Sequence, residues 1–338
     1  MYIPITNQNE LMIASSPLKN NYMQMKIFFI PLALLLSCGS VKTNTAQTSV
    51  SKQLLKDVET LSSDSYEGRK TGTKGAEMAR TYLTGRLKEI GLKPYPGFSS
   101  FEQRFEVKGR NGAAAIEGKN LIAYIPGKTD NTIVISAHYD HVGVIKNEVF
   151  NGADDNASGV AGLLQFAKHF SKNKPNNTLI FAIFDAEEMG LQGAKAFVAN
   201  PPVALEKIKL NVNMDMISHN DKGELYAAGA FKNPSLKGYL VTTNPKLKLL
   251  LGHDDPKLGQ DDWTNQSDQG AFNAKNIPFI YFGVEDHKDY HKATDEYQNI
   301  NKEFFIDAAN TIQSIIINID KQRDIQAIFR ENLQMNKQ

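Results

Sequence analysis

The stretch that decides the fold is Thr132–Phe170, TIVISAHYDHVGVIKNEVFNGADDNASGVAGLLQFAKHF. It opens with an apolar run, Thr132–Ser136, which predicts a buried strand. Asn156 then offers an N-cap to a helix over Ala157–Phe170, where apolar residues recur at the spacing of a buried helix face. A buried strand that leads into an amphipathic helix is the building unit of α/β folds.

The same alternation continues downstream. A second apolar run, Thr178–Phe184, precedes a helical pattern over Leu191–Ala199. Further strands are expected at Lys209–Asn213 and Ile277–Phe282, and a closing helix at Glu303–Ile319. Such alternation is typical of parallel strands covered on both faces. The sequence therefore predicts an α/β fold with a mixed, mostly parallel central sheet sandwiched between helices.

The flanking regions add elements to this centre. Helical spacing predicts helices over Leu54–Leu61 and Ala76–Ile90, and strands are expected at Phe101–Val107 and Asn120–Ile125. Residues 220–270 are polar and weakly periodic, so we expect one or two strands and long loops there.

Composition excludes some classes of function. The chain has 338 residues, enough for one large domain or two small ones, and its 38 basic and 37 acidic residues leave a net charge of +1. A balanced charge gives no field that would select nucleic acid. We therefore predict no nucleic-acid partner.

The single cysteine, Cys38, marks a targeting segment. It follows the apolar run Ile27–Leu36, which has the length of the apolar part of a signal peptide and is short for a membrane span. Leu35-Leu36-Ser37-Cys38 resembles the lipobox of bacterial lipoproteins. The resemblance implies an exported protein, anchored by a lipid on Cys38 and facing the periplasm or the cell surface; a plain secretory signal is the alternative.

Domain boundaries follow from this interpretation. We expect a signal peptide at residues 1–37, with a true start near Met23 or Met25. A lipidated flexible tether would occupy 38–49, the catalytic domain 50–320, and a polar C-terminal extension 321–338.

Metal-ligand side chains follow the apolar runs. In a parallel sheet, ligands bind beyond the carboxyl ends of the strands. The residues found there, in chain order, are His138, Asp140, Asp154, Asp155, Glu187, Glu188, Asp215, His287 and His291. Each alone has an ordinary explanation as a core histidine, a turn residue or a helix-start acid. Their recurrence at successive strand ends favours a divalent cation, and imidazole with carboxylate suits zinc, with cobalt or manganese as substitutes.

The ordered motifs resemble those of the M28 family of zinc aminopeptidases. They are SAHYDH (136–141), NGADDNASG (151–159), AEE (186–188), NMDM (213–216) and DYH (289–291), together with SDSYEGR (63–69) upstream. Downstream of the DYH motif, the matching residues include Asp295. In all, the similarity covers residues 52–318. Five motifs in order are a specific signal.

The resemblance implies the role of each residue. His138 and Asp215 would bind one zinc ion, Glu188 and His291 the other, and Asp154 would bridge both. Asp140 would orient His138 from outside the ligand set. Asp155 would follow the bridging residue through a peptide bond that is typically cis in the family.

Glu187 would be the general base of peptide hydrolysis, because it adjoins a ligand without being one. The resemblance therefore implies a dinuclear zinc enzyme that releases N-terminal residues from peptides with free N-termini. Three alternatives remain open. They are a glutaminyl-cyclase-like acyltransferase on the same fold, an inactive binding protein, and a carboxypeptidase or dipeptidase.

Some neighbouring side chains have two possible roles. His287 lies four residues before His291, and we choose His291 as the ligand because the Tyr-His pair matches the family. Tyr290 would hydrogen-bond in the site or pack, and Asp268 would line the substrate pocket or form a turn. The residues expected not to bind metal are His141, His169, His219 and His253.

Overall fold

The computed structural model describes residues 39–109, 114–322 and 325–329. The expected signal peptide, its start at Met23 or Met25, and Cys38 lie outside these ranges. Residues from Asn44 onward form one compact unit, to which every sheet and site residue belongs. In the part of the chain that is described, no helix combines the length and apolarity needed to cross a bilayer.

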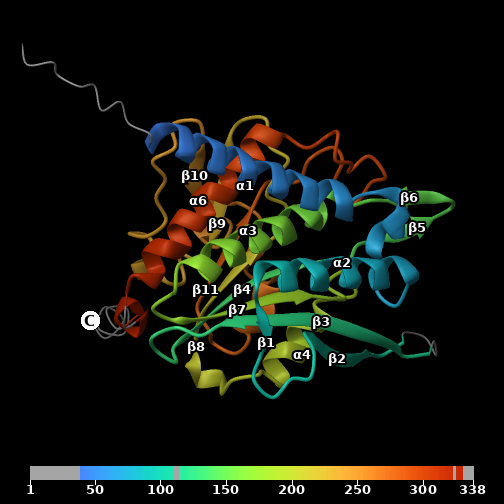
Figure 1. Ribbon diagram of the computed structural model, residues 1–338, viewed down its shortest axis with the longest axis horizontal. Helices are drawn as coiled ribbons and strands as arrows, with labels where there is room; N and C mark the ends of the chain where they lie inside the picture. Colours follow the sequence, from blue (N-terminus) through green and yellow to red (C-terminus); the bar gives the residue numbers. More distant parts are fainter. Residues whose placement is uncertain (1–38, 110–113, 323–324, 330–338) are drawn as a thin grey trace, which may run out of the picture. The chain divides into compact units, whose positions relative to one another are not determined.

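A nine-stranded sheet runs through this unit (Figure 1). Its strands are β1 (Lys93–Pro94), β2 (Glu102–Val107), β3 (Ile116–Ile125), β4 (Thr132–His138), β7 (Thr178–Phe184), β8 (Ile208–Met214), β9 (Glu224–Ala228), β10 (Lys248–Leu251) and β11 (Phe279–Gly283). Their order is β1-β3-β7-β4-β8-β11-β9-β10, with β2 paired to β3. The four central strands β7, β4, β8 and β11 are parallel, as are β9 and β10. The remaining pairs are antiparallel, so the predicted mixed, mostly parallel centre is confirmed.

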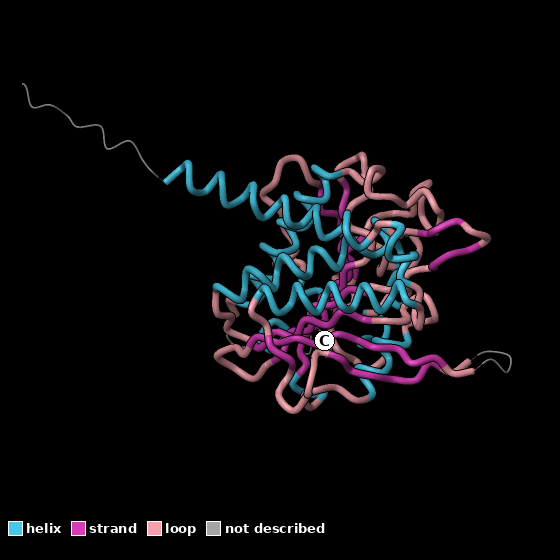
Figure 2. The backbone as a smooth tube through the Cα atoms, turned by 45° about the vertical axis from the view of Figure 1, so that its right-hand side comes forward, coloured by secondary structure: helices cyan, strands magenta, loops and turns pink. Residues whose placement is uncertain are grey.

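Helices cover both faces of the sheet, as predicted. One face packs against α1 (Gly39–Leu61), α2 (Lys74–Ile90), α3 (Gly159–Lys172) and α6 (Lys302–Asp320), and the other against α4 (Gln192–Ala199) and α5 (Gln269–Asn273) (Figure 2). Side chains alternate between these two cores along β4, since Ile133 and Ile135 join the first and Val134 the second. Burial on both faces explains why the central strands are continuous apolar runs.

Short elements connect these layers. The tight helical turns are η1 (Asp64–Arg69), η2 (Ala153–Ser158), η3 (Leu205–Lys207), η4 (Pro234–Leu236), η5 (Pro256–Leu258) and η6 (Trp263–Asn265). A hairpin of β5 (Gly143–Ile145) and β6 (Glu148–Phe150) follows β4. Lys146 and Asn147 form its turn at φ 50° and 67°, a backbone that asparagine tolerates. The sequence did not predict this hairpin, because its strands are only three residues long.

Two predicted segments have a different structure from the one expected. Residues 39–49 of the expected tether belong to the helix α1, which packs on the core through Leu54. The extension expected at 321–338 contributes to the core, since Ile325 and Ile328 are buried in it. Just before them, the Asp320 carboxylate accepts the backbone N–H groups of residues 176 and 177, which tether the turn that enters β7 to the end of α6.

The predicted helix over Ala157–Phe170 begins slightly later than expected. Residues 153–158 form the irregular turn η2, and α3 starts at Gly159. Asn156 is still the capping residue, because its Oδ1 accepts the N–H of Gly159 at 2.9 Å. The loop therefore enters the helix with residues 154 and 155 buried at the carboxyl edge of the sheet.

Candidate metal centre

The central parallel strands deliver polar side chains to one edge. His138 ends β4, Asp215 follows β8, and Glu187 and Glu188 follow β7 after a left-handed residue at Ala186. His291 comes from the loop after β11. The structure thus brings together side chains that are up to 153 residues apart, from His138 to His291.

Asp155 lies between two groups of these side chains. Its Oδ1 is 3.4 Å from Nε2 of His138, which is itself 3.2 Å from Oδ1 of Asp215. Its Oδ2 is 3.1 Å from Nε2 of His291, which lies 3.4 Å from Oε1 of Glu188. One carboxylate therefore faces a histidine and a carboxylate on each side.

Asp154, the predicted bridging residue, lies beside other partners than the predicted ligands. Its Oδ1 accepts the backbone N–H and the hydroxyl of Ser218, at 2.6 and 2.8 Å, and its Oδ2 lies 3.0 Å from Nε2 of His287. These bonds turn the carboxylate away from His138 and His291. The cis peptide bond likewise joins Asp155 to Asn156, and not Asp154 to Asp155.

Asp140 supports the site differently from the prediction. Nδ1 of His138 is 3.1 Å from the backbone carbonyl of Asp140 and 3.7 Å from its carboxylate. The carboxylate accepts the N–H groups of Glu187 and Glu188, at 3.0 and 3.3 Å. Asp140 therefore fixes the segment after β7, while its main chain orients the histidine.

The electrostatics at this edge are strongly perturbed. Burial alone would lower the pKa of His138, but the charges of Asp215 and Glu187 outweigh it and raise that pKa well above its usual value. Burial raises the pKa of Glu187 well above the range of an exposed glutamate. Burial also raises the pKa of Asp268 to about 7, with further upward pressure from Asp215.

His287 belongs to a separate group with Asp154. Its ring stacks on that of His219, with centroids 3.8 Å apart and planes 19° from parallel, and Asp289 lies beside the pair. A metal ion binds imidazole in the plane of the ring, and two planes so nearly parallel do not meet near both nitrogens. We therefore interpret this group as a support for Asp154. Tyr290 packs, since its ring stacks on His291 with centroids 4.1 Å apart.

Sequence reasoning missed two supporting residues. His141, expected to be uninvolved, is buried with its Nδ1 2.8 Å from Oε1 of Glu188. Burial would raise the pKa of Glu188, but contacts with His141 and His291 lower it well below its usual value. Asp295 accepts the N–H groups of residues 154 and 155, at 2.9 and 3.0 Å. The available signals were the place of His141 within the SAHYDH motif and the extension of the family resemblance to Asp295.

The donor set fits divalent zinc. Buried imidazoles and carboxylates without thiolate form both groups around Asp155. Both carboxylate oxygens of Asp268 are buried without a hydrogen-bond partner among the described residues. Such orphaned acceptors are rare in native proteins, and a cation near them would compensate their loss of water.

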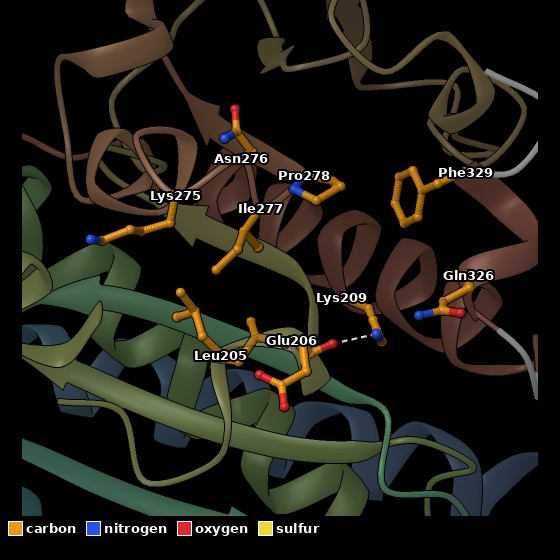
Figure 3. Close-up of a pocket in the computed structure, with 10 residues that line it drawn as sticks. Leu205, Glu206, Lys209, Lys275, Asn276, Ile277, Pro278, Gln326 and Phe329 are labelled. Carbon is orange, nitrogen blue, oxygen red and sulfur yellow. Dashed lines mark hydrogen bonds between the residues drawn. The ribbon is translucent and has the colours of Figure 1, made fainter. Parts of the chain in front are cut away.

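A large cavity lies away from this edge. A pocket of about 710 Å³ opens at the amino ends of β8 and β11, beside Ile208, Ile277 and Pro278 (Figure 3). Lys209 and Lys275 flank it, and no histidine or aspartate lines it. We locate the chemistry at the carboxyl edge, because the convergent acid and base groups are there.

Relatives among known proteins share the sequence in part. The chain is 26% identical over 279 residues to a vacuolar membrane protease of Candida tropicalis, and 30% identical over 208 residues to leucine aminopeptidase 2 of Trichophyton rubrum. These matches cover 76% and 54% of this chain. They span only 28% and 41% of the relatives' own lengths.

Solved structures share the fold. BSAP, a zinc aminopeptidase from Bacillus subtilis, has a TM-score of 0.63 at 16% identity, over 82% of this chain and 97% of that one. A glutaminyl cyclase from Bacteroides thetaiotaomicron has the same TM-score at 18% identity, over 80% and 97%. The sequence model of peptidase family M28 matches residues 120–316, which include His138, Asp155 and His291. Because this match spans more than half of the chain and contains the whole candidate site, the protein belongs to peptidase family M28.

Proposed function

We propose that the protein is a dinuclear zinc aminopeptidase that hydrolyses N-terminal residues from peptides. The position of Asp155 carries the proposal, since each of its oxygens faces a histidine and a second carboxylate. His138, Asp155 and Asp215 would hold one ion, and Asp155, Glu188 and His291 the other. Three protein ligands per ion leave room for water and substrate, as an open catalytic site requires.

Glu187 is the proposed general base. Zinc ions in this site would supply Lewis acidity that activates water and polarises the scissile carbonyl. Glu187 is held beside the ligands by the bond from its N–H to Asp140 and does not belong to either ligand group. Its carboxylate would take the proton of the attacking water and then return it to the leaving amine.

Asp268 is the proposed receptor for the substrate's α-ammonium group. It is buried, both of its oxygens lack a hydrogen-bond partner among the described residues, and it interacts with the charges of His138 and Asp215. It occupies the N-cap position of α5 but does not cap it. An ammonium donor would satisfy those acceptors and confine cleavage to free N-termini.

Two other functions compete. A glutaminyl cyclase shares the fold, and such an enzyme would release ammonia from an N-terminal glutamine without cutting the peptide bond. A binding protein would retain the pocket without turnover. The presence of Glu187 together with both ligand groups favours hydrolysis, because neither rival needs the complete set.

A substrate panel tests the proposal. The zinc-loaded chain should hydrolyse a subset of aminoacyl p-nitroanilides and leave their N-acetylated forms intact. Bound zinc should reach two ions per chain. Ammonia release from Gln-peptides with one bound ion would instead support the cyclase, and bound zinc without turnover on any substrate would support the binding protein.

We also propose export and membrane attachment through lipid on Cys38, with the catalytic domain beyond it. The support is the lipobox-like segment in the sequence. In a bacterial host, radiolabelled palmitate should enter the wild-type chain and not Cys38→Ser. Equal labelling of both chains, or none in either, would contradict the anchor.

A further inference from the structure

Arg69 is a fully buried cation whose hydrogen bonds all go to backbone carbonyls. Its Nε donates to Tyr139 at 2.8 Å, and its Nη2 donates to Gly152 at 2.9 Å. Its Nη1 donates to Leu61 at 2.7 Å and to Asn151 at 2.5 Å. Three of the four acceptors lie in the two segments that bear the proposed ligands.

Those segments are separate in the chain and are joined here by one side chain. Tyr139 directly follows His138, and Gly152 lies three residues before Asp155. Between them the chain leaves the sheet as the β5–β6 hairpin. The guanidinium is rigid and planar, so the directions of its N–H groups fix the separation of the carbonyls that accept them.

The backbone around Arg69 is shaped to place it there. Glu67, Gly68 and Arg69 have φ values of 49°, 62° and 53°, which are left-handed for three successive residues. Gly68 is required, since a Cβ there would collide with the carbonyl oxygen of Phe150. A run of disfavoured conformations persists only where the surrounding contacts enforce it.

The charge of Arg69 suits an acidic neighbourhood. Burial lowers the pKa of Arg69 to about 10, and the charges of Asp295 and Asp155 oppose that shift. The guanidinium therefore stays protonated at neutral pH, although none of its hydrogen bonds goes to a carboxylate. It adds positive charge to a site rich in carboxylates without occupying any ligand atom.

We propose that Arg69 is a positioning residue for the metal centre. It holds the segments that carry His138 and Asp155 at the separation at which both side chains reach one ion. The inference rests on the two-zinc function proposed above. It concerns metal affinity and geometry, which can be measured without any substrate.

The test compares two buried arginines. Arg86 lies in α2 and donates to Asp57 of α1, at 2.8 and 3.2 Å, outside the ligand segments. Arg69→Lys and Arg86→Lys each keep the positive charge and lose the planar fork. In the full chain, zinc affinity would be measured by competition with a chelator, and ligand geometry by the absorption bands of the cobalt-substituted protein.

We expect Arg69→Lys to weaken zinc binding by about tenfold or more and to change the cobalt bands, as outer contacts of metal sites do. Arg86→Lys should keep the wild-type affinity and spectrum, even where its melting temperature falls. Unchanged affinity and spectrum in Arg69→Lys would overturn the proposal. Equal losses in both variants would also overturn it, because they would reflect general destabilisation.

A milder variant covers the case in which Arg69→Lys does not fold. Asp64, in η1 with Arg69, is exposed and accepts a 2.6 Å bond from the side chain of Asn151, which belongs to one of the two ligand segments. Asp64→Ala should weaken zinc binding less than Arg69→Lys, and wild-type affinity in it would then count against the proposal. A wild-type chain that binds no zinc would overturn the proposed function as well, whereas wild-type binding that survives Arg69→Lys overturns only this inference.

Discussion

The two ends of the parallel strands differ in what they bury. At the carboxyl end, Nε2 of His138 lies 3.4 Å from a carboxylate oxygen of Asp155 and 3.2 Å from one of Asp215, and all three side chains are buried. At the amino end, a cavity of about 710 Å³ is lined by apolar residues such as Ile277 and Pro278 together with Glu206 and two lysines, and by no histidine or aspartate. Concentrated, perturbed charge thus distinguishes the carboxyl end of this sheet, where we propose that the chemistry occurs, and empty volume does not.

The largest expected effect comes from the residue between the two ligand groups. Asp155→Asn should abolish hydrolysis and weaken zinc binding by more than about 100-fold, beyond the loss typical of outer contacts. Asp154→Asn should keep two zinc ions and lose about 1–3 kcal/mol of stability, because the contacts with Ser218 and His287 are disturbed. Metal analysis measures the zinc bound by each variant, and thermal unfolding measures the stability of each variant. If Asp154→Asn instead lost zinc and hydrolysis while Asp155→Asn kept both, Asp154 would be the bridging residue.

The next effect separates catalysis from metal binding. Glu187→Gln should lower kcat by about 10²- to 10⁴-fold, because the amide cannot accept the proton of the attacking water. Bound zinc should stay at the wild-type level, since Glu187 is outside both ligand groups. Steady-state kinetics with metal analysis would check this. A variant that keeps wild-type kcat would remove Glu187 from the mechanism.

A smaller effect is a pH dependence confined to the carboxyl end. Without metal, burial raises the pKa of Asp268 to about 7, and bonds to Asp155 and Glu188 raise the pKa of His291 to about 10. Both groups bind protons more tightly when folded, against unfolded values of about 3.9 and 6.5. The stabilisation from each group is therefore present at low pH and is lost as the pH rises. For Asp268 the loss falls between about pH 4 and 7, and for His291 between about pH 6.5 and 10.

The melting temperature of the chelator-treated chain should accordingly fall from pH 5 to pH 9. Zinc would replace the proton on His291, so the zinc-loaded chain should lose the part of this slope that comes from His291, and its zinc affinity should rise with pH. Differential scanning fluorimetry of the metal-free and zinc-loaded chains from pH 5 to pH 9 would measure these melting temperatures. A metal-free chain that becomes more stable as pH rises would contradict the assignment of these groups.

The smallest effect is expected at the amino end. Lys275→Ala removes an exposed charge at the rim of the large cavity. Stability should change by less than about 0.5 kcal/mol, and kcat and zinc content should stay at their wild-type values. A large loss of hydrolysis in this variant would show that the amino end takes part in the reaction.

Strand and helix types were predictable because burial on both faces leaves a plain sequence pattern. Thr178–Phe184 is a strand with the predicted bounds, and the side chains that follow the central strands do converge. The two-residue strand β1 and the β5–β6 hairpin were not predictable, since pairs so short carry no periodicity.

Details of the site depend on the backbone, which explains the remaining errors. Asp154 and Asp155 are adjacent acids of equal chemistry, and the irregular path of residues 153–158 decides which one faces the histidines. His141 approaches Glu188 only because the chain reverses after β4. Arg69 binds carbonyls, which every residue possesses, so no partner side chain signals its position.

The end of α6 limits how far the chain can be shortened. The family match stops at residue 316, yet Asp320 secures the turn into β7, and Ile325 and Ile328 fill the core beyond it. A truncation at 316 would leave the N–H groups of that turn without their acceptor and would expose apolar surface that these two isoleucines cover. We therefore expect a fragment that ends at residue 316 to be less stable than one that extends to Ile328, past the limit that sequence similarity alone would set.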